Sequence, residues 1–487
     1  MRNSSAVCWR PATSARKFFR LTGKSQILIS EDSDELKRTG QYLADLLSLS
    51  TGFDIVVSSL EGDIKLMIID NSDLGAEGYE MIISEDQIVL KAPYPAGIFY
   101  AIQTIRQLLP AKIELSDEQT GPWEIATGTI RDYPRYSYRG SLLDVSRHFF
   151  GVEDVKRYLD FLAFYKMNVL HLHLTDDQGW RIEIKSWPNL TAYGGSTEVG
   201  GGEGGFYTQE DYKEIVEYAA DRFITIVPEI DMPGHSHAAM ASYPELNCDG
   251  NSPELYTGTD YGFSSFCTGR EITYQFIDDV IREIAALTPE PYIHIGGDES
   301  HVTQMEDYLL FIDKVQRIVN KYDKQMIGWD EIAQANLSNT SVVQLWNNAD
   351  FAMEAIRKGS KIIVSPATKT YLDMKYDSTT RLGLDWAGYI EVDDGYNWDP
   401  ASFIDGLTDD DILGVEAPLW SETVTNMDEI EYMAFPRLPG YAEIGWTSSE
   451  LRDWNEYKQR LGKHAARFKA MQIDFYRSEL VPWVDGL

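Results

Sequence analysis

The sequence is poor in cysteine, in positive charge and in long apolar runs. Only three of its 487 residues are cysteines, at positions 8, 248 and 267, and no Cys-x-x-Cys pattern is present, so neither a disulfide-rich scaffold nor a structural zinc site is expected. No apolar run approaches the roughly 18 residues of a membrane span. Lys and Arg number 43 against 77 Asp and Glu, a formal net charge of -34, which disfavours nucleic acid and anionic lipid as partners. These shortages favour a soluble enzyme with neutral or cationic substrates.

The N-terminal segment and the cysteines bear on the cellular compartment. Residues 1–23 carry basic side chains but lack an apolar core of about 7–15 residues, so no signal peptide is recognisable. We interpret this segment as a disordered leader, a cloning remnant or a trimmed export segment. Cys248 and Cys267 are 19 residues apart in a loop-like stretch, where a disulfide and two free thiols both remain open. A disulfide would favour secretion, and the missing signal peptide favours the cytoplasm.

Residues 24–132 are expected to form a small N-terminal α+β domain. The length of 487 residues exceeds one ordinary core, so more than one domain is expected. This region holds no cluster of catalytic residue types, and we assign it a packing role. Residue patterns predict strands at 26–30, 54–58 and 65–70, a hairpin of 80–84 with 87–91, and helices at 34–48 and 97–109.

Residues 133–487 show a repeated alternation of strand and helix. The predicted strands are 139–144, 168–174, 224–228, 292–295, 325–329, 342–346, 361–364 and 412–416. Helical patterns lie between most of them, at 152–166, 209–222, 271–287, 304–321 and 351–358, and a last helix is expected at 450–471. The fold class is therefore α/β, a (β/α)₈ barrel preceded by the small α+β domain. A doubly wound sheet is the alternative, but the glycine-rich stretch 194–205 does not follow a strand, so a dinucleotide site is not expected there.

The segment around Asp298 and Glu299 is the most informative in the chain. An apolar run ending at Ile295 is followed by two glycines and then by these two adjacent carboxylates. Like charges repel and burial disfavours ionisation, so one carboxyl of the pair is expected to hold its proton near neutral pH. An acid beside an ionised carboxylate suits the cleavage of a glycosidic bond.

Further polar and aromatic residues follow the other predicted strands. Because barrel active sites form at the carboxyl ends of the strands, we expect these side chains to meet at one mouth. Carboxylates and an arginine bind sugar hydroxyls, and aromatic rings stack on the apolar face of a pyranose. The pattern predicts a sugar pocket made from Asp144, Arg147, Asp176, Glu229, Asp231, His235, Trp329, Trp346, Tyr371, Asp373, Trp420 and Glu422.

Two His-x-His pairs raise the alternative of a zinc site. Seven of the eight histidines lie between His148 and His301. Residues i and i+2 share a face only in a regular strand, and no His-Glu-x-x-His helix or open three-ligand set is present. We therefore expect no catalytic metal and no cofactor, and we expect the histidines to orient carboxylates by hydrogen bonds.

Six segments, 144–148, 171–180, 231–237, 294–300, 371–373 and 420–422, resemble the signature blocks of family 20 glycoside hydrolases, the β-N-acetylhexosaminidases. They occur in the order seen in that family, and the small leading domain resembles its accessory domain. The resemblance implies a retaining exo-glycosidase in which the 2-acetamido oxygen of the substrate attacks the anomeric carbon and forms an oxazolinium.

The resemblance also implies a role for each site residue. Glu299 is expected to protonate the leaving oxygen and then activate water, and Asp298 to orient the acetamide and stabilise its positive charge. The catalytic set also includes Tyr371, which would bind the acetamido oxygen, and Asp176 and His235, which would tune Glu299. The substrate-binding set comprises Arg147, Trp329, Trp346, Asp373, Trp420 and Glu422.

The expected substrates are oligosaccharides or glycoconjugates that end in β-linked GlcNAc or GalNAc, chitin fragments among them. A lacto-N-biosidase of the same family and a non-catalytic sugar-binding barrel are the alternatives. The intact pair of Asp298 and Glu299 argues against the second. The sequence leaves the preferred sugar, the linkage and the oligomeric state open.

Overall fold

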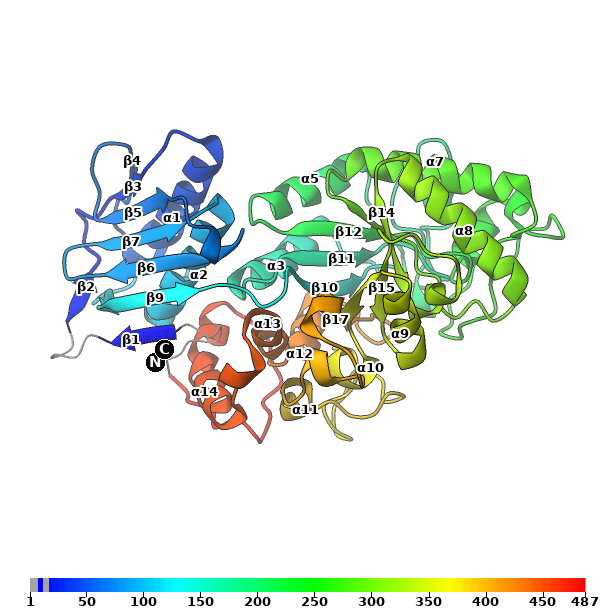
Figure 1. Cartoon of the computed structure of the whole chain (residues 1–487). Coiled ribbons are helices and arrows are strands. Elements are labelled where there is room, and N and C mark those ends of the chain that lie inside the picture. The colour runs from blue at the N-terminus through cyan, green and yellow to red at the C-terminus, as the bar shows by residue number, and fades with distance from the viewer. Residues whose placement is uncertain (1–7, 12–16, 487) are drawn as a thin grey trace.

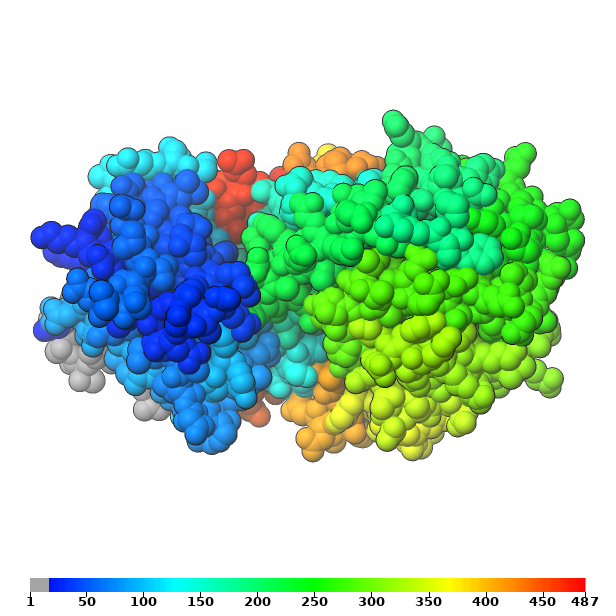
Figure 2. Space-filling view, turned by 90° about the horizontal axis from the view of Figure 1, so that it is seen from above, coloured from blue at the N-terminus to red at the C-terminus, as the bar shows by residue number. Residues whose placement is uncertain are grey.

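A computed structural model shows a closed eight-stranded barrel beside a smaller sheet-and-helix domain (Figure 1). The structure describes residues 8–11 and 17–486. Figure 2 shows the small domain, in blue, as one lobe and the barrel as a larger lobe, with part of the C-terminal segment, in red, visible between them. The predicted fold class is confirmed.

The small domain contains a seven-stranded sheet in the order β1-β9-β6-β7-β5-β3-β4 and a separate pair, β2 with β8. The predicted hairpin is present, because β6 and β7 are antiparallel with Ile83 opposite Ile88. Two helices, α1 (Asp34–Thr51) and α2 (Pro95–Leu108), pack against the sheet. The strands are β1 (Cys8–Pro11), β2 (Phe18–Arg20), β3 (Ile27–Ile29), β4 (Val57–Ser58), β5 (Ile64–Ile68), β6 (Tyr79–Ile83), β7 (Ile88–Ala92), β8 (Glu124–Ala126) and β9 (Gly128–Asp132).

The first residues differ from the expected disordered leader wherever the structure describes them. Strand β1 pairs antiparallel with β9, and β2 pairs with β8. Phe19 is buried, which gives β2 an apolar contact with the core. Both partners lie more than 100 residues away in the chain, so no local pattern indicated them. The rest of the proposed leader, residues 1–7 and 12–16, lies outside the described residues.

The barrel consists of eight parallel strands in sequence order, and it closes because the last strand, β17, pairs with the first, β10. A closed ring has no sheet edge, which rules out the doubly wound alternative. All eight predicted strands are present. They are β10 (Tyr138–Asp144), β11 (Val169–His173), β12 (Thr225–Glu229), β13 (Tyr292–His294), β14 (Gln325–Trp329), β15 (Val342–Leu345), β16 (Lys361–Val364) and β17 (Ile412–Leu419).

The connecting segments depart from a regular barrel at several points. A short 3₁₀ turn, Asp330–Gln334, joins β14 to β15, and long insertions follow β11, β12 and β16. The start of one helix, predicted at residue 209, reflects local capping. Helix α5 begins after Thr208, whose hydroxyl accepts the Asp211 N–H at 3.1 Å while the Asp211 carboxylate accepts the Thr208 N–H at 2.9 Å. No helix in the described part of the chain is both long and apolar enough to cross a membrane.

The helices of the barrel domain are α3 (Val152–Phe164), α4 (Asn189–Ala192), α5 (Gln209–Ala220), α6 (His237–Ser242), α7 (Glu271–Leu287), α8 (Met305–Lys321), α9 (Ala349–Arg357), α10 (Ala367–Thr370), α11 (Val392–Tyr396), α12 (Met427–Ala434), α13 (Leu438–Trp446) and α14 (Trp454–Ala470).

Buried charges join the small domain to the barrel. Arg139 of β10 donates two hydrogen bonds of 2.9 Å to the carboxylate of Glu77, which precedes β6. Lys166 lies 3.1 Å from Asp132 at the end of β9, and both are buried. Arg467 of α14 donates to Glu114 of the small domain at 2.7 Å across 353 residues of sequence. Ion pairs as well as apolar packing therefore hold the small domain against the barrel domain.

Candidate active site

The turn after β13 holds the two adjacent carboxylates in place. Gly296 and Gly297 have φ angles of 65° and 96°, and Glu299 has a φ of 45°, which is rare for a residue with a side chain. A Cβ atom at Gly296 would lie 1.8 Å from Oδ1 of Asp231, so only glycine fits there. Strained backbone of this kind persists where surrounding contacts enforce it, commonly at functional sites.

Asp298 and Glu299 converge on one imidazole. Nε2 of His235 lies 3.3 Å from a carboxylate oxygen of Glu299 and 3.6 Å from one of Asp298. Burial raises the pKa of Asp298, the charge of His235 opposes this and that of Glu299 adds to it, and the result is about 7. The sequence predicted a raised pKa for one carboxyl of the pair, and the structure assigns the raised pKa to Asp298.

A chain of hydrogen bonds continues from His235 away from the two carboxylates. Nδ1 of His235 lies 3.1 Å from Asp176, and the other oxygen of Asp176 lies 2.8 Å from Nε2 of His173. Arg147 also contacts Asp176 at 2.8 Å. Burial would raise the pKa of Asp176, but Arg147 and the histidines lower it well below its ordinary value. Asp176 is therefore an ionised partner for His235.

Arg147, Asp373 and Glu422 form a second polar cluster at the same mouth. Asp144 holds Arg147 in place, because its carboxylate accepts the Arg147 backbone N–H at 3.1 Å and lies 3.3 Å from the guanidinium. Both oxygens of Asp373 and one of Glu422 are buried without a hydrogen-bond partner. Burial, followed by the charge of Glu422, raises the pKa of Asp373 well above its ordinary value. Such groups suit a ligand that supplies several hydroxyl donors.

Aromatic rings line the space between the two polar clusters. The ring centroids of Trp329 and Trp420 are 5.8 Å apart, and those of Tyr371 and Trp420 are 6.2 Å apart. The indole N–H of Trp346 donates to Glu331 at 3.0 Å. Trp346 packs in the same apolar cluster as Tyr371 and Trp420. These four residues come from four different strand ends, as the barrel prediction required.

Trp386 and Glu331 belong to this neighbourhood, although the sequence did not single them out. The Trp386 ring lies 6.2 Å from Trp346 and 6.0 Å from Tyr371, and 55% of the residue is exposed. It borders a cleft of about 930 Å³ outside Trp346. Trp386 lies within a long insertion, where no strand end marks it. A pocket-facing tryptophan in a loop is not distinguishable from a surface one by sequence alone.

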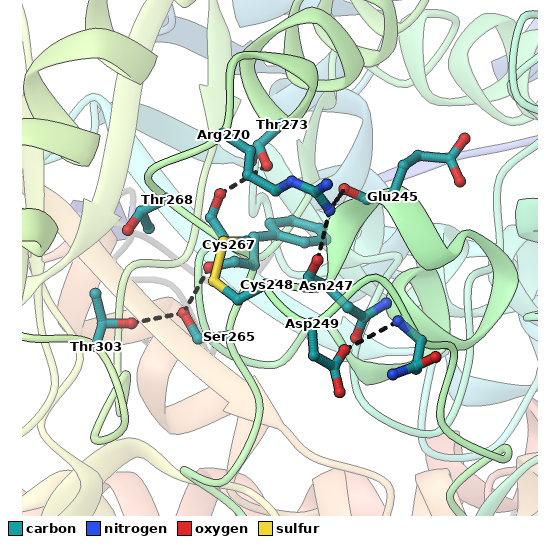
Figure 3. Close-up of a disulfide and its surroundings, with 12 residues drawn as sticks. Glu245, Asn247, Cys248, Asp249, Ser265, Cys267, Thr268, Arg270, Thr273 and Thr303 are labelled. Carbon is teal, nitrogen blue, oxygen red and sulfur yellow. Dashed lines mark hydrogen bonds between the residues drawn. A yellow bond between two sulfur atoms is a disulfide. The ribbon is translucent and has the colours of Figure 1, made fainter.

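A disulfide holds the long loop that follows α6. Cys248 and Cys267 are bonded, with Cα atoms 4.9 Å apart (Figure 3). Around it, Arg270 donates to the Asn247 carbonyl at 2.7 Å, and Ser265 and Thr303 share a hydrogen bond of 2.5 Å. Nearby, the hydroxyl of Ser264 donates to Asp177, the neighbour of Asp176. The disulfide, one of two possibilities left open by the sequence, thus anchors a loop that reaches the site.

Several carboxylate and imidazole groups lie close enough to be considered for metal binding. The groups include His171, Glu229 and His294, and also Asp176, Asp231 and His235, with one atom of each residue within 4.8 Å of the others. Glu229 already accepts the Trp329 N–H at 2.9 Å and lies 2.5 Å from Nδ1 of His173. Because these groups already neutralise and bond one another, we assign them no metal.

Comparison with known families assigns both domains of the chain to one family. Residues 136–449 match glycosyl hydrolase family 20, catalytic domain, and residues 9–133 match domain 2 of the same family. The beta-N-acetylhexosaminidase of Cellulomonas fimi is 40% identical over 464 residues, which cover 94% of this chain and 92% of the relative.

Solved structures show the same likeness over nearly the whole chain. The family 20 beta-N-acetylhexosaminidase of Streptomyces coelicolor A3(2) is 50% identical, with a TM-score of 0.96 and 99% of both chains covered. The N-acetyl-beta-hexosaminidase of Streptomyces plicatus in complex with Thio-NAglucal is also 50% identical, with a TM-score of 0.94, covering 99% of this chain and all of the other. At 50% identity over nearly the whole chain, the similarity is one of sequence as well as of fold.

Proposed function

The chain belongs to glycosyl hydrolase family 20, and on that basis we propose how its residues carry out the reaction. It is a retaining β-N-acetylhexosaminidase that removes a terminal β-linked GlcNAc or GalNAc from the non-reducing end of its substrate by substrate-assisted catalysis. The single observation that carries the assignment of residues is the convergence of Asp298 and Glu299 on Nε2 of His235.

Two carboxylates on one side of the site do not suit a double displacement. A retaining enzyme with an enzyme nucleophile places its acid and its nucleophile on opposite sides of the anomeric carbon, about 5–5.5 Å apart. Here Asp298 and Glu299 are neighbours in sequence and approach one nitrogen atom. The acetamido oxygen of the substrate is then the nucleophile: it bonds to the anomeric carbon as the bond to the leaving oxygen breaks.

Glu299 is the proposed acid and base. Its proton passes to the leaving oxygen, and the resulting carboxylate then takes a proton from the water that opens the oxazolinium. His235 faces the Glu299 carboxylate, and Asp176 holds the other ring nitrogen of His235. Asp176 thereby fixes the orientation of the His235 imidazole, and His235 adjusts the proton affinity of Glu299.

Asp298 is the proposed partner of the acetamide nitrogen. As the oxazolinium forms, positive charge develops on the acetamido group, and an ionised Asp298 stabilises it electrostatically. Tyr371 would donate to the acetamido oxygen. Trp329, Trp346 and Trp420 would enclose the acetamide and the lower face of the sugar, where they exclude water.

Arg147, Asp373 and Glu422 are proposed to bind the ring hydroxyls away from the scissile bond. Their unpartnered polar atoms support this assignment, because sugar hydroxyls can both donate to the carboxylates and accept from Arg147. Substrates of this site are oligosaccharides with a terminal N-acetylhexosamine. We extend the proposal to glycoconjugates and chitin fragments with the same terminus.

The acid assignment is tested with Glu299→Gln and two substrates that differ in their leaving group. General acid catalysis contributes about 10²–10⁴ in rate. Hydrolysis of N,N'-diacetylchitobiose should fall by that factor, whereas 2,4-dinitrophenyl N-acetylglucosaminide, whose leaving group needs no proton, should lose much less in its first step. Equal losses for both substrates, or unchanged turnover, would remove Glu299 as the acid.

The nucleophile is tested by trapping and by inhibition. A thiazoline analogue of the oxazolinium should bind much more tightly than N-acetylglucosamine, and mass spectrometry during turnover should find no glycosyl-enzyme adduct. A covalent adduct on Asp298 or another carboxylate would contradict acetamide participation. Including lacto-N-biose glycosides and GalNAc glycosides in the same assay separates the remaining alternatives within the family.

A further inference from the structure

The buried carboxylate of Glu229 has no role in the proposed reaction, although it contacts residues that belong to the site. It ends strand β12, in the barrel interior, and is fully buried. Strand register places it level with His173 of β11 and His294 of β13.

One oxygen of Glu229 contacts the wall of the acetamide pocket. Oε1 accepts the indole N–H of Trp329 at 2.9 Å. The same oxygen lies 3.1 Å from Nδ1 of His294, but that nitrogen already accepts the Gly296 N–H at 3.0 Å and so has no proton for Glu229. The bond from Trp329 is therefore the one that Oε1 receives.

The other oxygen of Glu229 contacts the series of hydrogen-bonded side chains that leads to the proposed acid, Glu299. Oε2 lies 2.5 Å from Nδ1 of His173, whose Nε2 lies 2.8 Å from Asp176. Asp176 contacts His235 at 3.1 Å, and His235 contacts Glu299 at 3.3 Å. Acidic and imidazole groups thus alternate without interruption from Glu229 to Glu299.

We propose that Glu229 is a positioning residue that couples the two halves of the reaction, because one carboxylate orients both the Trp329 wall of the acetamide pocket and the His173–Asp176–His235 chain behind Glu299. This inference rests on the proposed function and adds to it a residue that touches neither the substrate nor the acid.

The surrounding charges keep Glu229 ionised. Burial alone would raise the pKa of its carboxyl, but the neighbouring imidazoles, His173 foremost, lower it well below the ordinary value. Burial lowers the pKa of His171, and the charges of Glu416 and Glu229 outweigh this and raise it to about 9. An ionised carboxylate accepts from both sides at once, which a neutral side chain of the same size cannot do.

The barrel also supplies a matched control, Glu416. This carboxylate of β17 is equally buried and lies 2.9 Å from Nδ1 of His171, whose Nε2 lies 3.0 Å from Oε2 of Glu229. Its other partners are Tyr138 and Gln344, at 2.5 and 2.7 Å, and not Trp329 or His173. Replacing Glu416 by Gln removes a similar buried charge but leaves the contacts of Glu229 with Trp329 and with His173 in place.

The test compares Glu229→Gln with Glu416→Gln in two quantities, the acid ratio and an inhibition constant, that do not depend on how much enzyme is folded. The first is kcat/KM for chitobiose divided by kcat/KM for the dinitrophenyl glycoside, which reports on the acid. The second is the inhibition constant of the thiazoline analogue, which reports on the acetamide pocket. In Glu229→Gln the first should fall and the second should rise by at least about tenfold. In Glu416→Gln both should stay within about twofold of wild type.

Three outcomes would overturn the coupling: neither quantity changes in Glu229→Gln, only one changes, or Glu416→Gln changes both equally. If Glu229→Gln does not fold, Trp329→Phe replaces it, since it removes the N–H that binds Oε1 together with part of the indole ring. That variant should weaken the thiazoline and also lower the acid ratio, although Trp329 does not contact Glu299, and an unchanged acid ratio would overturn the coupling. Failure of the proposed function itself would appear separately, as an inactive wild type or an unimpaired Glu299→Gln.

Discussion

At the scale of single residues, the charge of Asp298 links the pH of the solution to the stabilisation of the oxazolinium. Its pKa is raised from 3.8 to about 7, so the folded enzyme holds this proton over a range in which the unfolded chain has lost it. The stabilising form in catalysis is the anion. Activity should therefore rise with pH through about 7, while the contribution of this carboxyl to folding stability declines between 3.8 and 7.

The variant Asp298→Asn tests this account. Its kcat/KM above pH 7 should be lower by about 10²–10³, by analogy with the loss of one preorganised electrostatic group. Because Asn does not titrate, the acidic limb seen in wild type should be absent from the variant. A loss of less than tenfold, or a retained limb, would contradict the role of Asp298 as the charged partner.

Gly296 should not tolerate a side chain. Gly296→Ala would place a Cβ atom 1.8 Å from Asp231, at a φ of 65°. We expect activity to be lost and the free energy of unfolding to fall by more than the roughly 1–2 kcal/mol that left-handed backbone alone costs. Gly200→Ala is the control, since its φ is 77° but no atom lies within 4 Å of the added Cβ. Equal destabilisation of the two variants, by chemical denaturation, would show that the contact with Asp231 is unimportant.

The sequence indicated those site residues that a barrel strand presents at its end. Asp298, Trp329 and Glu422 could be named because β-strand periodicity and barrel geometry together place them at one mouth. Trp386 could not be named, because its position depends on the path of a long insertion, and only the folded chain determines that path. Glu229 was identified at its strand end, but its contact with Trp329 depends on the neighbouring side chains and not on local pattern.

At the scale of elements, the loop closed by Cys248 and Cys267 should stabilise both the fold and the mouth of the site. A closed loop of this length contributes about 3 kcal/mol by the chain-entropy estimate. The double variant Cys248→Ser, Cys267→Ser should lose about that much unfolding free energy. It should also raise KM, since Ser264 in the same loop donates to Asp177.

Reduction of the wild type provides the matching measurement for the disulfide. Wild-type enzyme unfolded in the presence of a strong reductant should show the stability of the double variant, and the double variant should be insensitive to reductant. If reduction changes the wild type by less than about 1 kcal/mol, the loop is held mainly by its hydrogen bonds, such as that from Arg270 to Asn247.

Elements were predicted well where their pattern is local. The eight barrel strands and the hairpin of β6 with β7 follow from apolar runs and turns. Strands β1 and β9, by contrast, are distant in sequence and pair at the edge of the sheet, where a short segment shows little of its own pattern. For this reason the expectation of disorder does not hold at residues 8–11 and 18–20.

At the scale of the whole molecule, the pair of buried Arg139 and partly buried Glu77 should make the two domains unfold together. Breaking a fully buried ion pair by removing one partner costs about 3–5 kcal/mol, which is an upper bound here because Glu77 is 18% exposed. Arg139→Met should lower the unfolding free energy by more than about 1 kcal/mol, the most that an exposed pair contributes, and by no more than that upper bound. Arg20→Met, which breaks an exposed pair with Glu124, should cost at most about 1 kcal/mol.

Calorimetry gives the second readout of this prediction. Wild type and Arg20→Met should each show one unfolding transition, because the domains share a buried interface. Arg139→Met should show a lower transition temperature and the first sign of separate transitions. Two well-resolved transitions in the wild type would mean that the interface contributes little to either domain.

The bond between Arg467 and Glu114 has a consequence for how the protein is made. These residues are 353 positions apart, and a ribosome adding about 5–20 residues per second needs roughly 20–70 s to emit the second after the first. During that interval the nascent N-terminal lobe exposes the surface that α14 later covers. We expect the growing chain to depend on ribosome-associated chaperones until its final helix emerges.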